Sequence, residues 1–163
     1  MTAHTQAQGE AQERRRSMLR TAMGPDIAAA LNDPDVIEVM VNPDGVLRLD
    51  QLGQGRVDTG RKLAASETER IIRLVAAHVG NEVHADRPIV SAELESFGDG
   101  RGGERFEGLL PPVAPGPCFA IRKPAANIHT LAEYVASGVM APWQAEALAD
   151  AVRTRRNILV AGG

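Results

Sequence analysis

The most constraining feature of the sequence is a tight turn, Asn42-Pro43-Asp44-Gly45, between two short runs with apolar residues. Proline presets one backbone dihedral and glycine accepts a positive φ, so these residues together favour a reversal of the chain. The run before the turn, residues 36–41, is largely β-branched, and residues 46–50 alternate apolar and polar side chains. The segment therefore predicts two antiparallel strands, the second of them half-buried.

The rest of the first 124 residues predicts helices and further strands. Residues 1–12 lack an apolar period and are predicted to be a disordered arm, and residues 13–31 form an amphipathic helix with a break at Gly24-Pro25. Residues 51–60 predict a loop with at most a short strand at 56–57. Ser66 to Glu69 fits a capping box, which predicts the start of a helix that ends at Gly80. Strands are predicted at residues 89–97, 104–110 and 117–122.

The remaining residues return to helical patterns. Thr130 and Glu133 form a second capping box, which opens a short helix, and Pro142 starts another helix that runs to about Arg155. Residues 157–161 are predicted to be a buried strand. The fold class is therefore α+β: an N-terminal domain over residues 13–124 with an antiparallel sheet and flanking helices, a linker over residues 125–141, and the first elements of an α/β domain over residues 142–163.

Composition narrows the class of protein. The net charge of −3 gives no overall field that would draw the chain to nucleic acid or an acidic membrane. Aromatic residues make up only 3%, which argues against a surface for stacking bases. The single cysteine, Cys118, excludes a disulfide framework, and the four histidines show no ligand spacing, so no metal site is expected.

Three motifs have a functional and a simpler structural interpretation. Residues 98–103 contain G-x-G-x-x-G, but a strand is predicted after them where the dinucleotide fingerprint requires a helix, so they are interpreted as a hairpin tip. Glu93 and Glu95 share a strand face and could act as acid and base, although a solvated face is favoured. The basic clusters at residues 13–20 and 153–156 could bind the phosphates of DNA or lipid, although ordinary surface charge is favoured.

Arg105 and Arg122 are the most interesting charged residues, because each lies within a mostly apolar strand. An arginine in such a place is costly unless it has a partner, and its planar guanidinium suits phosphate oxygens. A structural salt bridge or a polar strand face is the alternative. From the strands alone, both interpretations remain open.

Four segments occur in this order and at this spacing in one family: residues 36–45, 104–113, 120–124 and 157–163. The last, which ends in Gly162-Gly163, looks like the strand and loop that open a Walker A site, G-x-x-x-x-G-K-[ST]. From about residue 20 to the end, the chain resembles the secretion superfamily of hexameric traffic ATPases. Within that superfamily it is most similar to the conjugal-transfer ATPases of type IV secretion, the TrbB type.

This resemblance implies a RecA-like ATPase domain after the linker, with ATP bound between the two domains. Arg105 and Arg122 match arginines that approach the nucleotide phosphates, Gly162 and Gly163 match the opening of Walker A, and residues 140–143 fall on the adenine side. ATP and Mg²⁺ are implied for the full-length protein, whose remaining Walker A residues and Walker B acid would lie beyond residue 163. We therefore expect this chain alone to bind ATP poorly and not to hydrolyse it.

The resemblance also implies partners and a location. These are a homohexamer in the full-length form, the inner-membrane secretion or conjugation machinery, and the cytoplasm, with docking at the inner membrane through partners. No sequence-specific nucleic-acid binding is predicted. The alternative is a stand-alone assembly or binding module without a nucleotide role, which would use the basic segment at residues 13–20 and bind DNA or vesicles in a salt-sensitive way.

Overall fold

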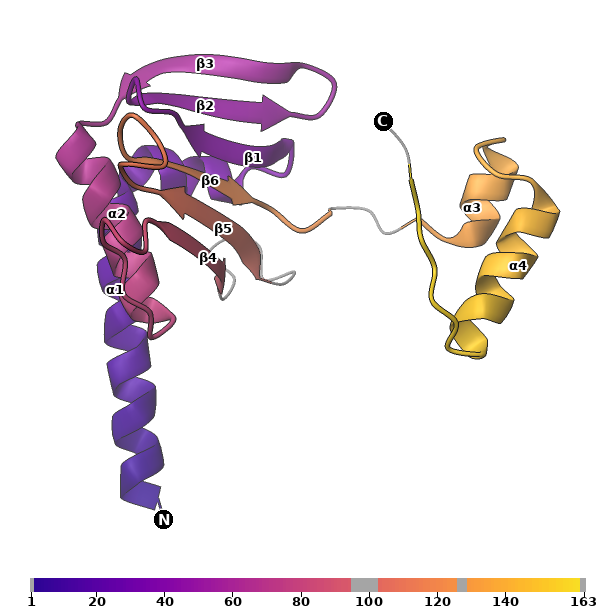
Figure 1. Ribbon diagram of the computed structural model, residues 1–163, viewed down its shortest axis with the longest axis horizontal. Helices are drawn as coiled ribbons and strands as arrows, with labels where there is room; N and C mark the ends of the chain where they lie inside the picture. The colour runs from indigo at the N-terminus through magenta and orange to yellow at the C-terminus, as the bar shows by residue number, and fades with distance from the viewer. Residues whose placement is uncertain (1, 95–102, 126–128, 162–163) are drawn as a thin grey trace. The chain divides into compact units, whose positions relative to one another are not determined.

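The computed structural model describes residues 2–94, 103–125 and 129–161, which belong to two compact units, Met1–Ala126 and Asn127–Gly163 (Figure 1). The division between the units falls inside the predicted linker. In chain order the elements are α1 (Thr2–Asn32), β1 (Val36–Val41), β2 (Val46–Gln51), β3 (Gly55–Lys62), α2 (Ala65–His78), β4 (Ile89–Leu94), β5 (Glu104–Leu109), β6 (Cys118–Arg122), α3 (Leu131–Ala136) and α4 (Pro142–Arg153).

The first unit is built on a six-stranded sheet in the order β3-β2-β1-β6-β5-β4. Every neighbouring pair is antiparallel, which confirms the predicted α+β class. The predicted hairpin is also confirmed: the amide of Gly45 donates to the carbonyl of Asn42 at 2.8 Å. Gly45 has a φ of 77°, and a Cβ added there would clash with the carbonyl oxygen of Leu63, so the turn requires glycine.

Strand β3 is longer than the sequence suggested, because residues predicted as mostly loop form eight residues of edge strand. The signal was weak because nearly all its side chains are exposed and polar, so no alternation of apolar residues marks it. Pairing with β2 supplies the stability instead, and the hydroxyl of Thr59 adds a hydrogen bond of 2.7 Å to the carbonyl of Leu47.

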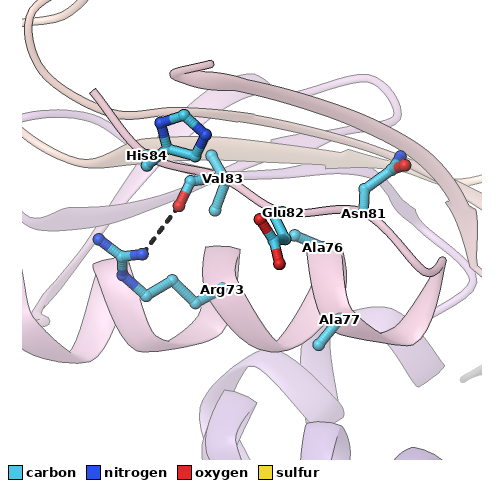
Figure 2. A pocket seen from close by; sticks show the side chains of 7 residues that line it. All are labelled: Arg73, Ala76, Ala77, Asn81, Glu82, Val83 and His84. Atoms are coloured by element: carbon cyan, nitrogen blue, oxygen red, sulfur yellow. Dashed lines mark hydrogen bonds between the residues drawn. The ribbon is translucent and has the colours of Figure 1, made fainter. Parts of the chain in front are cut away.

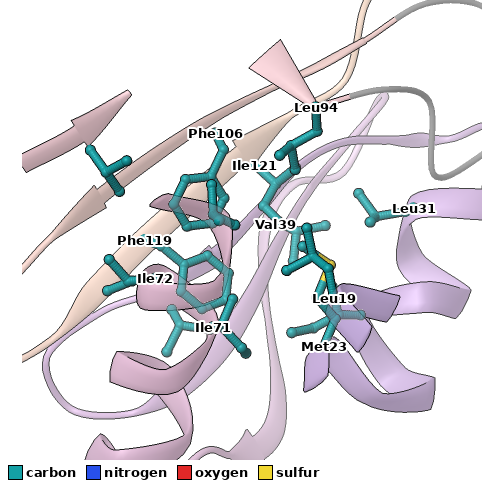
Figure 3. Packing of buried hydrophobic residues seen from close by; sticks show 14 of the residues in the cluster. Leu19, Met23, Leu31, Val39, Ile71, Ile72, Leu94, Phe106, Phe119 and Ile121 are labelled. Atoms are coloured by element: carbon teal, nitrogen blue, oxygen red, sulfur yellow. The ribbon is translucent and has the colours of Figure 1, made fainter. Parts of the chain in front are cut away.

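Helices α1 and α2 lie side by side and pack on one face of the sheet, where they form the core. Helix α1 begins at Thr2 and so includes residues for which the sequence predicted a disordered arm; alanine, glutamine and glutamate there are good helix formers. The predicted break is present at Gly24, whose φ and ψ of 76° and 174° are not helical. Figure 3 shows the core residues, which include Leu19, Met23, Ile71, Ile72, Val39, Phe106, Phe119 and Ile121.

The predicted cap of α2 is displaced. Its N-cap is Ala64, not Ser66, and the carboxylate of Glu67 accepts a hydrogen bond of 2.7 Å from the amide of Ala64. Glu69 instead accepts from Arg73 at 2.8 Å, one turn along the helix. The N-cap therefore lies two residues before the serine that was predicted to hold it. A glutamate that reaches back can satisfy an orphan amide without a capping side chain.

The second unit contains α3 and α4. The predicted capping box of α3 is confirmed, since Thr130 Oγ1 accepts from the amide of Glu133 at 3.2 Å and Glu133 Oε2 accepts from the amide of Thr130 at 2.6 Å. The predicted buried strand at 157–161 was wrong: residues 156–161 form no strand, and Leu159 is 93% exposed. A strand needs a hydrogen-bonded neighbour, and no described strand pairs with this segment. Val152 of α4 is exposed as well.

Candidate functional site

Arg105 and Arg122 lie directly opposite each other on the neighbouring strands β5 and β6. Directly opposed residues project from the same face of a sheet, with Cβ atoms about 4.5–5.5 Å apart. One position along each strand, Phe106 opposes Ile121, and both are fully buried in the core. Because side chains alternate between faces, the two arginines project from the other face, where both are exposed.

The two guanidinium groups have no counter-ion within the described part of the chain. Among the described residues, neither lies within the 4.0 Å that defines an ion pair with a carboxylate. Like charges directly opposite each other destabilise a sheet, so this pair is not explained by packing or by a structural salt bridge. Two arginines at directly opposed strand positions, without a carboxylate partner among the described residues, form an arrangement that a tetrahedral oxyanion can bridge.

The arginine pair belongs to a row of charged residues that crosses the sheet. Glu93 on β4 opposes Arg105, and Glu38 on β1 opposes Arg122. Glu38 is also opposite Asp50 on β2, which in turn is opposite Arg56 on β3. In the sequence, Glu93 is a candidate only together with Glu95, and Glu38 carries no signal of its own. We call the face that carries this row the open face of the sheet.

The other predicted site residues are not brought to this row by the described structure. Gly162, Gly163, Glu95 and residues 98–102 lie outside the described residues. The segment after the glycine motif is strand β5 and not a helix, in agreement with the rejection of a dinucleotide fingerprint. In the second unit, Trp143 of the predicted adenine side is 69% exposed at the start of α4.

The described chain offers neither a metal site nor an activated thiol. No group of histidine, cysteine, aspartate or glutamate residues among those described could hold a metal ion. Cys118 is partly buried, and burial raises the pKa of its thiol, which makes it a poor nucleophile. In the described chain there is also no helix that combines the length and the apolar character needed to cross a bilayer.

A groove of about 320 Å³ lies at the C-terminal end of α2 (Figure 2). Its lining includes Arg73, Ala76, Ala77 and Val83. The guanidinium of Arg73 donates to the carbonyl of Val83 at 2.8 Å and to Glu69, so it is held by the fold. The groove therefore resembles a structural junction between α2 and the following loop more than a ligand site, and the arginine pair is the stronger candidate.

The sequence of the chain is similar to those of two conjugal transfer proteins. The chain is 41% identical over 145 residues to a protein of Sinorhizobium fredii named "Probable conjugal transfer protein TrbB", and 42% identical over 145 residues to the conjugal transfer protein TrbB of Rhizobium radiobacter. In both cases the match covers 89% of this chain and 43% of the relative. The chain thus spans less than half the length of these relatives. No protein-family model matches it.

A solved structure has the same fold. The VirB11 ATPase from the Brucella suis type IV secretion system, in complex with sulphate, matches with a TM-score of 0.62 and 24% identity, over 86% of this chain and 43% of that one. The resemblance recognised from the sequence motifs is confirmed by these matches. The chain is therefore a homologue of the TrbB conjugal transfer proteins, with a fold that it shares with part of a type IV secretion ATPase.

Proposed function

We propose that this chain forms the N-terminal part of an ATPase that drives conjugative DNA transfer by type IV secretion, and that Arg105 and Arg122 bind the phosphates of its nucleotide. The observation that carries the proposal is the arginine pair itself, directly opposed, exposed and unpaired among the described residues. A phosphate placed between the two guanidinium groups would relieve their repulsion and receive charged hydrogen bonds from both.

The chemistry of phosphoryl transfer suits such a pair. Little covalent chemistry falls to the protein, which acts mainly by positioning the phosphates and stabilising the developing negative charge. An arginine on a rigid strand can do both, because the core row of Phe106 and Ile121 fixes its backbone. The complex of the VirB11 ATPase with sulphate, a tetrahedral oxyanion, is compatible with anion binding in this fold.

The wider assignments rest on the family resemblance. ATP and Mg²⁺ would be held in the longer protein, where the first unit contributes arginines and a surface for ring assembly, and six copies would form the ring. We propose a cytoplasmic location, with docking on the secretion or conjugation machinery at the inner membrane. Gly162 and Gly163 would open the Walker A loop.

The test uses a chimera in which this chain replaces the matching part of the TrbB protein of Rhizobium radiobacter. ATP hydrolysis is measured for Arg105→Gln and Arg122→Gln. A hydrogen bond to a charged group contributes on the order of 1.5–3 kcal/mol, so each change should lower kcat/KM roughly tenfold to a hundredfold.

Arg56→Gln is the matched control. Arg56 is an exposed arginine in the same row, but it lies three strands from Arg122, a separation of roughly 14 Å at the usual strand spacing. This control should keep the hydrolysis rate of the unmodified chimera. If all three variants fold and hydrolyse ATP equally fast, the arginine pair does not contact the nucleotide and the proposal fails.

A further inference from the structure

The arginine pair is flanked on both sides by a carboxylate. In register across four adjacent strands lie Glu93, Arg105, Arg122 and Glu38, which we call the charged tetrad. Its formal charges sum to zero, since two arginines are matched by two glutamates. An anion bound between the arginines would therefore have a negative charge on either side, one strand beyond each guanidinium.

The two glutamates have different surroundings. Glu93 is exposed on the edge strand β4, and its side chain lies against Gly103: a Cβ added to Gly103 would be 2.7 Å from Cγ and 3.0 Å from Oε1 of Glu93. Gly103, two residues before Arg105, thus leaves the space that the side chain of Glu93 occupies. Glu38 is half-buried on β1, between Arg122 on one side and Asp50 on the other.

We propose that Glu38 and Glu93 are specificity-determining residues that weaken the phosphate affinity of the arginine pair. This inference rests on the proposed function. In the absence of an anion, the two carboxylates offset the repulsion between the guanidinium groups, although neither approaches to ion-pair distance. When a phosphate binds, the same carboxylates repel it. The pair is then a weak anion site by itself, which holds a phosphate firmly only when other groups or a cation contribute.

The direction in which the anion affinity changes when the glutamates are removed distinguishes this role from a purely structural one. If the glutamates served only to hold the arginines in place, their removal would weaken anion binding or leave it unchanged. If they oppose the anion, their removal strengthens binding. Under water-like screening, a unit negative charge about 6 Å from a bound anion changes its binding constant about threefold. Two such carboxylates together change it roughly tenfold.

The experiment titrates inorganic pyrophosphate into the 163-residue chain at low ionic strength and follows backbone amide shifts of β5 and β6 by NMR. Glu93→Gln and Glu38→Gln should each tighten binding about threefold, and the double variant roughly tenfold. Glu38→Asp, which keeps the charge, should bind as the unmodified chain does. Glu82→Gln removes the same charge from the loop after α2, at the groove of Figure 2, and should leave the binding constant unchanged.

The outcomes distinguish this inference from the function on which it rests. If Arg105→Gln and Arg122→Gln abolish pyrophosphate binding while both glutamate variants bind no more tightly than the unmodified chain, the glutamates do not oppose the anion, and only this inference is overturned. If the arginine variants bind normally, or if no variant binds at all, the phosphate site itself is refuted. The exposed position of Glu93 keeps the test decisive even if the half-buried Glu38→Gln variant does not fold.

Discussion

Gly108 offers a sharp test of how tightly the core beneath the arginine pair is packed. It lies in β5, on the core face, three residues after Arg105. A Cβ added to Gly108 would be 2.7 Å from Cε1 of Phe106 and 3.1 Å from both Cγ1 and Cγ2 of Ile72. Phe106 cannot easily give way, because it is fully buried and stacks on Phe119 with ring centroids 5.5 Å apart.

We expect Gly108→Ala to lower the free energy of unfolding by about 1–3 kcal/mol, the usual cost of overpacking a well-filled core. Urea unfolding followed by far-ultraviolet circular dichroism measures it. Fluorescence would not, since the one tryptophan, Trp143, belongs to the other unit.

Gly116→Ala is the control. A Cβ added to Gly116 would be 3.5 Å from its nearest atom, in Pro43, which is an ordinary contact distance. Gly116 is also not among the glycines with a positive φ. Its free energy of unfolding should stay close to that of the unmodified chain. If Gly108→Ala is as stable as Gly116→Ala, the core around Phe106 can expand at little cost, and the argument from close packing is refuted.

Three further predictions concern turns and helix caps. Hydrogen bonds from Arg48 and from a backbone amide lower the pKa of Asp44 from 3.8 to about 2. Because the folded-state pKa is depressed, the contribution of Asp44 to stability is present above pH 3.8 and is lost as the pH falls toward 2. An NMR titration should place the midpoint of Asp44 near 2, and Asp44→Asn should remove that part of the acid dependence. Thr130→Ala should cost about 1 kcal/mol in the stability of α3, measured by hydrogen exchange of its amides. Ser66→Ala should leave the unfolding free energy of the first unit unchanged, whereas Glu67→Ala should lower it by about 0.5–1.5 kcal/mol; equal effects would contradict the observed start of α2.

Local patterns in the sequence predicted the elements that have strong local signals. The turn at Asn42 to Gly45, the break at Gly24 and the cap at Thr130 are each decided by residues close in the chain, and each was predicted correctly. Strand β3 and the end of the chain were not, for opposite reasons. The exposed strand lacks an apolar period although pairing stabilises it. Residues 157–161 contain an apolar run but have no described strand to pair with.

The candidate site could be predicted from the sequence only in part, for a different reason. Each arginine could be recognised from its own strand, but Glu38 could not, because its relation to Arg122 depends on β1 pairing with β6. These strands are separated in sequence by β2, β3, α2, β4 and β5. Alternation within a strand gives the face on which a residue lies, whereas only the register between distant strands gives its neighbours.

That register also explains why the geometry of the site depends on the core. The row of Phe106, Ile121 and Val39 is buried on one face, and the charged tetrad is the adjoining row on the other. A slip of β5 by one residue would expose the ring of Phe106 and bury the guanidinium group of Arg105, and each change is costly. The hydrophobic core thus holds Arg105 opposite Arg122 despite their repulsion, so that an anion site can exist on the open face.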